Sequence, residues 1–209
     1  MPIRVAVIGA GVSGLTCAVV CADHGWRTEI FAEQIGTTSL AAAAMWYPYD
    51  AGPPERAIPW ALQTYRKLEE LALQPDTGVS MITLRMFSRT TVIEIPEWAV
   101  PLGAARIRSG IPAAFVSGFT LDVPLTDSSL YLDYLTRRFQ KAGGVIHLNR
   151  RVAKFEEVDL AFDLVINCAG IGARTLAHDP DLEPHRGQVV IVPSLELSSA
   201  VVSDDAHPA

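Results

Sequence analysis

Six residues close to the amino terminus have the spacing of a phosphate-binding turn. They read Gly9-Ala10-Gly11-Val12-Ser13-Gly14, which is a GxGxxG pattern. In this pattern the first glycine permits a tight turn, the second lets backbone N–H groups approach a pyrophosphate, and the third lets a helix pack closely on a strand. The positive end of the following helix then faces the phosphates. We therefore expect this turn to bind a nucleotide.

The residues around the turn predict the β-α-β unit that such a site needs. An apolar, strand-like run covers residues 3–8, helical spacing covers 15–24 and ends at Gly25, and 28–31 predicts a second strand. Glu33 follows that strand, about twenty residues after the glycines, where a carboxylate accepts hydrogen bonds from ribose hydroxyls. A solvated turn carboxylate is the alternative for Glu33. The unit alone does not distinguish FAD from NAD.

A second segment of the chain is expected to approach the same nucleotide. Residues 162–168 form an apolar strand that ends in Ala169-Gly170, and these small residues would let the backbone come close to a ligand. Two such crossings suit a long ligand lying along the carboxyl edge of a sheet. An ordinary buried strand followed by a glycine turn is the alternative.

The remaining segments predict an α/β fold with an interruption. Residues 35–59 are rich in Gly, Ala and Pro and indicate a loop packed near a ligand, whereas 60–73 and 130–142 have helical spacing. Short alternating runs in 81–119, such as Thr90–Ile95, predict antiparallel strands, and 145–148 and 187–192 predict strands that resume the parallel sheet. We expect one discontinuous Rossmann-type domain with a parallel sheet, interrupted by an inserted antiparallel sheet.

Composition excludes several classes of protein. The 209 residues are 49% hydrophobic and carry a net charge of −6 with scattered Lys and Arg, so we expect no nucleic-acid surface. Cys17, Cys21 and Cys168 form no CxxC pair, so we expect neither a disulfide framework nor a metal site. Cys17 and Cys21 lie four apart on a predicted buried helix face, and we expect them to be inert core thiols. The first apolar run is too short to cross a bilayer. These features favour a reducing, cytoplasmic location away from membranes.

Four motifs together carry a more specific signal. Residues 5–15 contain the glycine turn, 42–49 read AAAMWYPY, 165–173 read VINCAGIGA, and 179–188 run from Asp179-Pro180 to Arg186-Gly187-Gln188. In this order they resemble the D-amino-acid oxidase family, and the resemblance covers essentially the whole chain. The last three motifs are the specific ones, because unrelated Rossmann proteins do not share them.

The resemblance implies a fold and a division of the chain. It implies noncovalent FAD in an extended pose, with the isoalloxazine ring at the boundary between the nucleotide domain and the inserted sheet. Residues 1–50 and 121–192 would form the discontinuous FAD-binding Rossmann domain. Residues 51–120 and 193–209 would be segments of an incomplete, antiparallel substrate domain.

The resemblance also implies roles for individual residues. Glu33 would contact the adenosine ribose, Thr38 and Ser39 the pyrophosphate, and the Val152 main chain the adenine. Tyr47 would be the substrate-facing residue. Turn capping is the alternative for Thr38 and Ser39, and a core aromatic is the alternative for Trp46. The full set of expected cofactor-binding residues is Gly9, Ala10, Gly11, Val12, Ser13, Gly14, Glu33, Thr38, Ser39, Ala43, Ala44, Met45, Trp46, Val152, Cys168, Ala169 and Gly170, of which Ala43 to Trp46 would run along the flavin.

The implied activity is oxidative deamination of D-amino acids. The α-hydrogen passes to the flavin as hydride, the imino acid hydrolyses to a 2-oxo acid and ammonia, and O2 reoxidises the flavin to give hydrogen peroxide. No side-chain acid or base is implied, and the five histidines receive no catalytic role.

Family members continue with a carboxylate-binding arginine, active-site tyrosines and a late glycine-rich stretch, so the match is to their amino-terminal portion. Two alternatives stay open: a related amine oxidase acting on glycine or sarcosine, and a non-catalytic FAD-binding fragment. A homo-oligomer, or a further C-terminal segment, is also left open.

Overall fold

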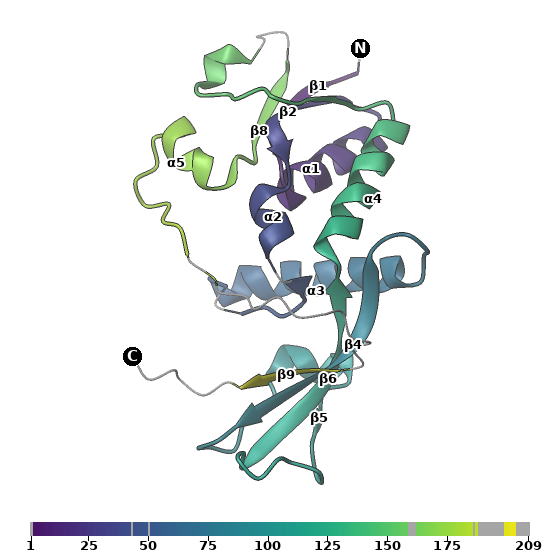
Figure 1. Ribbon diagram of the computed structural model, residues 1–209, viewed down its shortest axis with the longest axis vertical. Coiled ribbons are helices and arrows are strands. Elements are labelled where there is room, and N and C mark those ends of the chain that lie inside the picture. The colour runs from purple at the N-terminus through teal and green to yellow at the C-terminus, as the bar shows by residue number, and fades with distance from the viewer. Residues whose placement is uncertain are drawn as a thin grey trace. The chain divides into compact units, whose positions relative to one another are not determined.

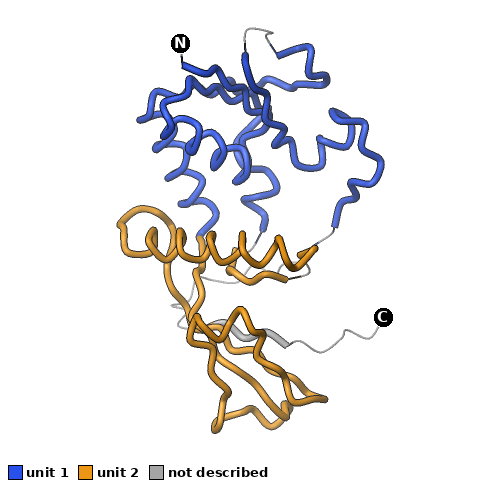
Figure 2. Tube along the Cα trace, turned by 180° about the vertical axis from the view of Figure 1, so that it is seen from behind, with its two compact units in different colours: residues 1–43, 127–190 blue, residues 44–126, 191–209 orange. Residues whose placement is uncertain are grey.

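The computed structural model describes residues 2–42, 44–49, 51–158, 162–185, 187 and 199–203. The chain divides into two compact units, which are coloured separately in Figure 2. The first unit comprises residues 1–43 and 127–190, and the second comprises 44–126 and 191–209. Each unit is built from segments distant in sequence.

The first unit contains a parallel sheet of four strands (Figure 1). The strands are β1 (Arg4–Ala10), β2 (Arg27–Ile35), β7 (Val145–His147) and β8 (Leu164–Asn167). Their order is β7-β2-β1-β8, and every neighbouring pair runs parallel. The expected Rossmann-type parallel sheet is therefore present, with the first strand at its centre.

Two helices cover one face of this sheet. Helix α1 (Val12–Asp23) and helix α4 (Ser128–Lys141) lie side by side in Figure 1, and Arg138 Nη2 contacts Asp23 Oδ2 at 2.6 Å between them. Alternation along β1 turns Val5 and Val7 toward these helices. The core on this face has as its principal members Val5, Val7, Leu15, Ile30, Leu132, Leu135 and Phe139.

The opposite face of the sheet is covered by short elements. These are the 3-10 helices η2 (Phe155–Glu157) and η3 (Gly170–Gly172) and the short helix α5 (Ala173–Leu176). Ala6 and Ile8, the alternate residues of β1, pack here against Val158 and Leu176. This second core lies beneath the carboxyl ends of the strands, where the candidate site is found.

The second unit is built on a mostly antiparallel sheet. Its strands are β3 (Ala44–Met45), β4 (Val79–Ser88), β5 (Ala105–Arg106), β6 (Ser117–Thr126) and β9 (Ser199–Ser203). Strands β4 and β6 pair over ten positions, β3 and β5 also pair with β6 antiparallel, and β9 joins β4 in parallel. The expected antiparallel sheet is thus present. Helix α3 (Pro54–Ala72) and the 3-10 helix η1 (Glu97–Leu102) complete this unit.

The expectation of a strand at Thr90–Ile95 was wrong. These residues form no strand, because side-chain hydroxyls rather than a neighbouring strand satisfy the backbone. Ser88 Oγ accepts the N–H groups of Thr90 and Thr91, and Ser117 Oγ accepts that of Ile93. Serine hydroxyls compete with sheet ladders in this way.

Element limits also differ from the sequence expectation. Helix α3 begins at Pro54 rather than residue 60, since proline is well suited to the first helical turn. The stretch 35–59, expected to be a loop, holds the short helix α2 (Thr37–Ala41) and strand β3. The strand expected at 187–192 lies almost entirely outside the described residues. Among the described residues, no helix is both long and apolar enough to cross a membrane.

Candidate functional site

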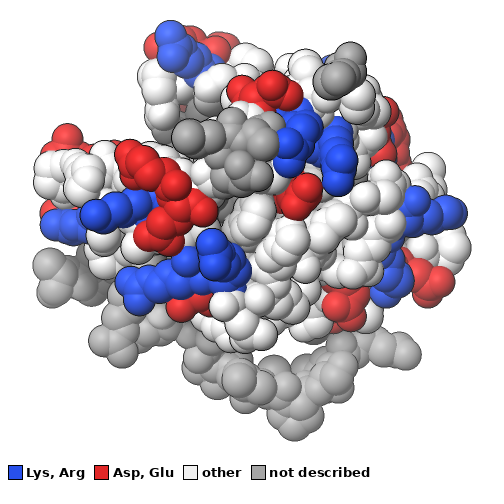
Figure 3. Space-filling view, turned by 90° about the horizontal axis from the view of Figure 1, so that it is seen from above, with Lys and Arg blue, Asp and Glu red and all other residues white. Residues whose placement is uncertain are grey.

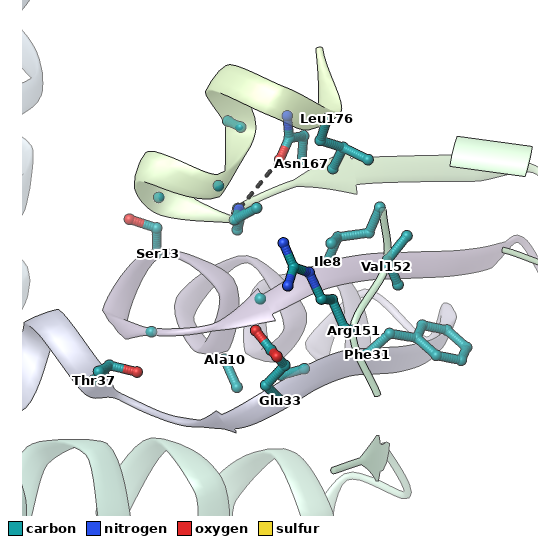
Figure 4. A pocket seen from close by; sticks show the side chains of 18 of the residues that line it. Ile8, Ala10, Ser13, Phe31, Glu33, Thr37, Arg151, Val152, Asn167 and Leu176 are labelled. Carbon is teal, nitrogen blue, oxygen red and sulfur yellow. Dashed lines mark hydrogen bonds between the residues drawn. The ribbon is translucent and has the colours of Figure 1, made fainter. Parts of the chain in front are cut away.

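A cavity of about 650 Å³ opens at the carboxyl ends of β1, β2 and β8 in the first unit (Figure 4). This volume falls within the roughly 300–1,000 Å³ of small-molecule and cofactor sites. Ligands of parallel sheets bind at this edge, because the turns after the strands leave backbone groups open there. The position and size of the cavity fit part of an extended dinucleotide.

The glycine turn forms the floor of the cavity. Gly9 has a φ of 104°, and a Cβ atom there would overlap the Cys168 carbonyl group, so a side chain is excluded at this crossing. Gly11 is the N-cap residue of α1 and lines the cavity, and it has no side chain of its own to cap the helix. The turn therefore brings bare backbone and the positive end of α1 to the cavity, as a bound pyrophosphate requires.

Ser39 fastens helix α2 to this turn. Its hydroxyl accepts the N–H of Val12 at 3.1 Å, which is one of the N–H groups left open at the start of α1. A Cβ atom at Gly11 would lie 3.2 Å from the same hydroxyl oxygen. The Ser39 hydroxyl thus lies beside the backbone where a phosphate would bind.

The end of β2 supplies the acidic side of the cavity. Glu33 is exposed, and its side chain projects into the cavity in Figure 4. Its carbonyl accepts the N–H of Asn149 at 3.0 Å, and the Ala32 carbonyl accepts that of Arg150 at 3.0 Å. These two hydrogen bonds place the following residues, Arg151 and Val152, beside Glu33.

The end of β8 closes the other side. The Cys168 N–H donates to the Ile8 carbonyl at 2.8 Å, and Asn167 Oδ1 accepts the N–H of Ala169 at 3.2 Å, the bond dashed in Figure 4. Burial, followed by the neighbouring thiols Cys17 and Cys21, raises the pKa of Cys168 to about 12. Cys168 is therefore a neutral thiol that contributes packing and backbone to the site.

Most of the expected cofactor-binding residues meet in this cavity. Those that line it are Gly9, Ala10, Gly11, Val12, Ser13, Glu33, Thr38, Ser39, Val152, Cys168, Ala169 and Gly170. Gly14 is instead buried beneath the turn, against the Gly9 carbonyl. Ala43 lies outside the described residues.

Of the residues expected along the flavin, Ala44, Met45 and Trp46 belong to the second unit and line no part of this cavity. Ala44 and Met45 form β3, paired with β6. Trp46 is 8% exposed and donates its Nε1–H to the Ala61 carbonyl at 3.1 Å. Its ring packs edge-on against that of Tyr65, with the ring centroids 4.9 Å apart. Trp46 therefore serves as a core aromatic of that unit.

Tyr47, the residue expected to face substrate, is half-buried in the same unit. Its hydroxyl lies 3.6 Å from the Met86 sulfur. Its ring packs edge-on against that of Trp98, with the ring centroids 5.4 Å apart. Packing thus fixes the position of this side chain.

Sequence reasoning missed several lining residues, among them Thr37, Arg151, Asn167 and Leu176. The signal for Asn167 was present, because it immediately precedes the small residues that end β8. The approach of Arg151 to Glu33 depends on backbone bonds between segments over a hundred positions apart, which no local pattern predicts.

The charges of the cavity are few. Among the residues that the structure describes, the charged ones that line it are Glu33, Arg150 and Arg151. On the face drawn in Figure 3, basic and acidic side chains are interspersed among one another.

Comparison with known proteins identifies relatives over nearly the whole chain. The family model described as FAD-dependent oxidoreductase matches residues 4–208. A D-amino-acid oxidase of Rubrobacter xylanophilus is 36% identical over 99% of this chain and 64% of its own length. A D-amino-acid oxidase of Streptomyces coelicolor is 38% identical over 97% of this chain and 63% of its own length. The chain therefore spans somewhat less than two thirds of these relatives.

A solved structure shares the fold. Glycine oxidase from Geobacillus kaustophilus superposes with a TM-score of 0.70 at 18% identity, covering 97% of this chain and 67% of that one. At this identity the likeness concerns the fold alone.

Proposed function

Because this chain belongs to the FAD-dependent oxidoreductase family, we propose that it is the FAD-binding part of an oxidase that deaminates D-amino acids. The two relatives described above, both D-amino-acid oxidases, support this substrate class. The observation that carries the proposal is the single cavity shared by the glycine turn, Glu33, Val152 and the end of β8.

The residues of the cavity suit the ADP half of FAD. The backbone of Gly9 to Ser13, at the start of α1, would hold the pyrophosphate, aided by the hydroxyls of Thr38 and Ser39. Glu33 would accept hydrogen bonds from the ribose hydroxyls. The main chain of Val152 would meet the adenine, and the segment 168–170 would pass beside the adenosine and phosphates.

The chemistry belongs to the cofactor. FAD, when bound, supplies the acceptor for hydride from the substrate Cα–H and is reoxidised by O2 to give hydrogen peroxide. The protein binds and orients, and we assign no acid, base or metal to this chain. We retain as proposals Ala44, Met45 and Trp46 along the flavin, Tyr47 toward substrate, and residues 1–50 and 121–192 as the FAD-binding domain. A reducing, cytoplasmic setting, in which the three free thiols persist, is part of the proposal.

A visible absorbance spectrum tests cofactor and reaction in sequence. The purified chain is mixed with FAD and desalted, and D-alanine is then added without oxygen. Retained flavin that bleaches supports both the site and the activity. Retained flavin that stays yellow supports FAD binding but shows that these residues alone do not oxidise D-alanine. Colourless protein contradicts FAD binding by these residues.

A second candidate is a related amine oxidase acting on glycine or sarcosine, because a fold shared with a glycine oxidase does not by itself determine the substrate. A substrate panel with peroxide detection, run on the full-length protein, distinguishes the two. Peroxide from D-alanine supports the first candidate, and peroxide from sarcosine but not D-alanine supports the second. An absence of peroxide from every amine tested would favour a non-catalytic FAD-binding protein.

A further inference from the structure

With FAD bound, negative charges in the proposed cavity would outnumber the positive charge that the helix end supplies. The pyrophosphate of FAD carries two negative charges, and Glu33 adds a third at the cavity wall. The end of a helix contributes only about half a positive charge. Among the described residues, Arg150 and Arg151 are the cationic side chains that line the cavity. An arginine is therefore the group able to balance the bound anion.

Arg151 is held where it can do this. The segment just before it is tied to the end of β2, because the N–H groups of Asn149 and Arg150 donate to the carbonyls of Glu33 and Ala32 at 3.0 Å each. Figure 4 shows the Arg151 side chain reaching into the cavity between Glu33 and the end of β8. Its backbone is thus anchored, and its long side chain is directed into the cavity.

The guanidinium has no other partner among the described residues. No ion pair or side-chain hydrogen bond occupies it there, and Glu33 beside it also has no ion-pair partner within 4.0 Å. The planar guanidinium presents paired N–H donors that match phosphate oxygens, and such charge-assisted bonds are about twice as strong as neutral ones.

We propose that Arg151 binds the pyrophosphate of FAD and so makes the cavity selective for nucleotides that carry a diphosphate. This inference rests on the proposed function, and it adds a residue that neither the glycine motif nor the family resemblance pointed to. Glu33 and Arg151 would then divide the ADP half between them: the carboxylate binds the ribose hydroxyls and the guanidinium binds the phosphates.

Calorimetric titration of the whole chain with ADP and with adenosine tests this role. Arg151→Ala is expected to weaken ADP binding by about tenfold or more, the usual effect of losing a charge-assisted hydrogen bond, and to change adenosine binding by less than about twofold. Arg151→Lys keeps the charge but loses the paired donors, so an intermediate loss is expected. Lys141→Ala, which removes one exposed charge from the end of α4, is the matched control.

Each outcome is decisive. Equal weakening of ADP and adenosine would place Arg151 on the adenosine, and unchanged ADP binding would remove it from the site; either result overturns the inference while the proposed FAD site stands. Failure of the unsubstituted chain to bind both nucleotides would overturn the FAD site together with the inference. Because Arg151 is exposed, its variants should have the same unfolding temperature as the unsubstituted chain. Arg151→Lys provides a second measurement if Arg151→Ala does not fold.

Discussion

Gly14 of α1 lies directly against Gly9 of β1: a Cβ atom on Gly14 would overlap the Gly9 carbonyl oxygen. Helix and strand therefore pack backbone to backbone at this point. This close approach holds the start of α1 over the glycine turn, where the turn and the helix end meet the cavity.

Gly14→Ala should consequently destabilise the first unit. The new methyl group has to displace backbone rather than a flexible side chain, so we expect a loss of about 3 kcal/mol in unfolding free energy. Urea unfolding measures this loss. Gly52→Ala is the control, because no atom lies within 4 Å of its added Cβ. Its effect should stay within about 0.5 kcal/mol, and an equal loss in both variants would show that Gly14 is no special contact.

Glu33→Gln should weaken FAD without weakening FMN, which has no adenosine ribose. The exchange removes a charged acceptor, and we expect FAD binding to fall about tenfold. Quenching of flavin fluorescence on titration with protein gives both affinities. Glu156→Gln, another exposed carboxylate of the first unit, serves as the control.

The outcome for FMN makes the Glu33 prediction specific. An equal loss of FMN affinity would mean that Glu33 acts on the general charge of the cavity and not on the ribose. Since Glu33 is exposed, the thermal unfolding temperature of the variant should match that of the unsubstituted chain.

How much of the structure could be predicted from the sequence depended on how far apart in the chain the interacting residues are. The β-α-β unit was predictable because Gly9, Gly11 and Gly14 and the flanking apolar runs are set by local spacing. Thr90–Ile95 has a local strand pattern but no strand, because the distant Ser117 hydroxyl satisfies its backbone. Arg151 went unnoticed since its position depends on bonds to the end of β2. Local patterns thus predicted the β-α-β unit, whereas long-range hydrogen bonds decide where a strand-like pattern fails and which side chains share a site.

Tyr65→Phe should destabilise the second unit while leaving nucleotide binding unchanged. The Tyr65 hydroxyl donates to the Asp122 carbonyl at 3.0 Å from a side chain that is 5% exposed. Losing this bond should cost about 1 kcal/mol in urea unfolding. Tyr49→Phe, at 77% exposure, is the matched control and should cost nothing measurable. Reduced ADP affinity in Tyr65→Phe would contradict the assignment of the ADP site to the first unit alone.

The Cys168 thiol should resist alkylation in the folded protein. Burial and its neighbours raise its pKa from 9.0 to about 12, so little reactive thiolate exists at pH 8. Cys17 and Cys168 both lie at partly exposed positions, so it is the raised pKa of Cys168 that limits its reaction. Mass spectrometry after brief iodoacetamide treatment should find Cys168 unmodified in the folded protein and all three cysteines modified in urea. Rapid modification of folded Cys168 would contradict its raised pKa.

The same raised pKa predicts a dependence of stability on pH. The folded protein binds the Cys168 proton more tightly than the unfolded chain does, so its contribution is complete below pH 9 and is lost as the pH rises from 9 toward 12. Cys168→Ala abolishes this contribution at every pH. Urea unfolding should therefore show stability falling less steeply above pH 9 in Cys168→Ala than in the unsubstituted chain. Parallel pH profiles would mean that another group, such as buried Tyr65 whose pKa is also raised, accounts for the alkaline loss.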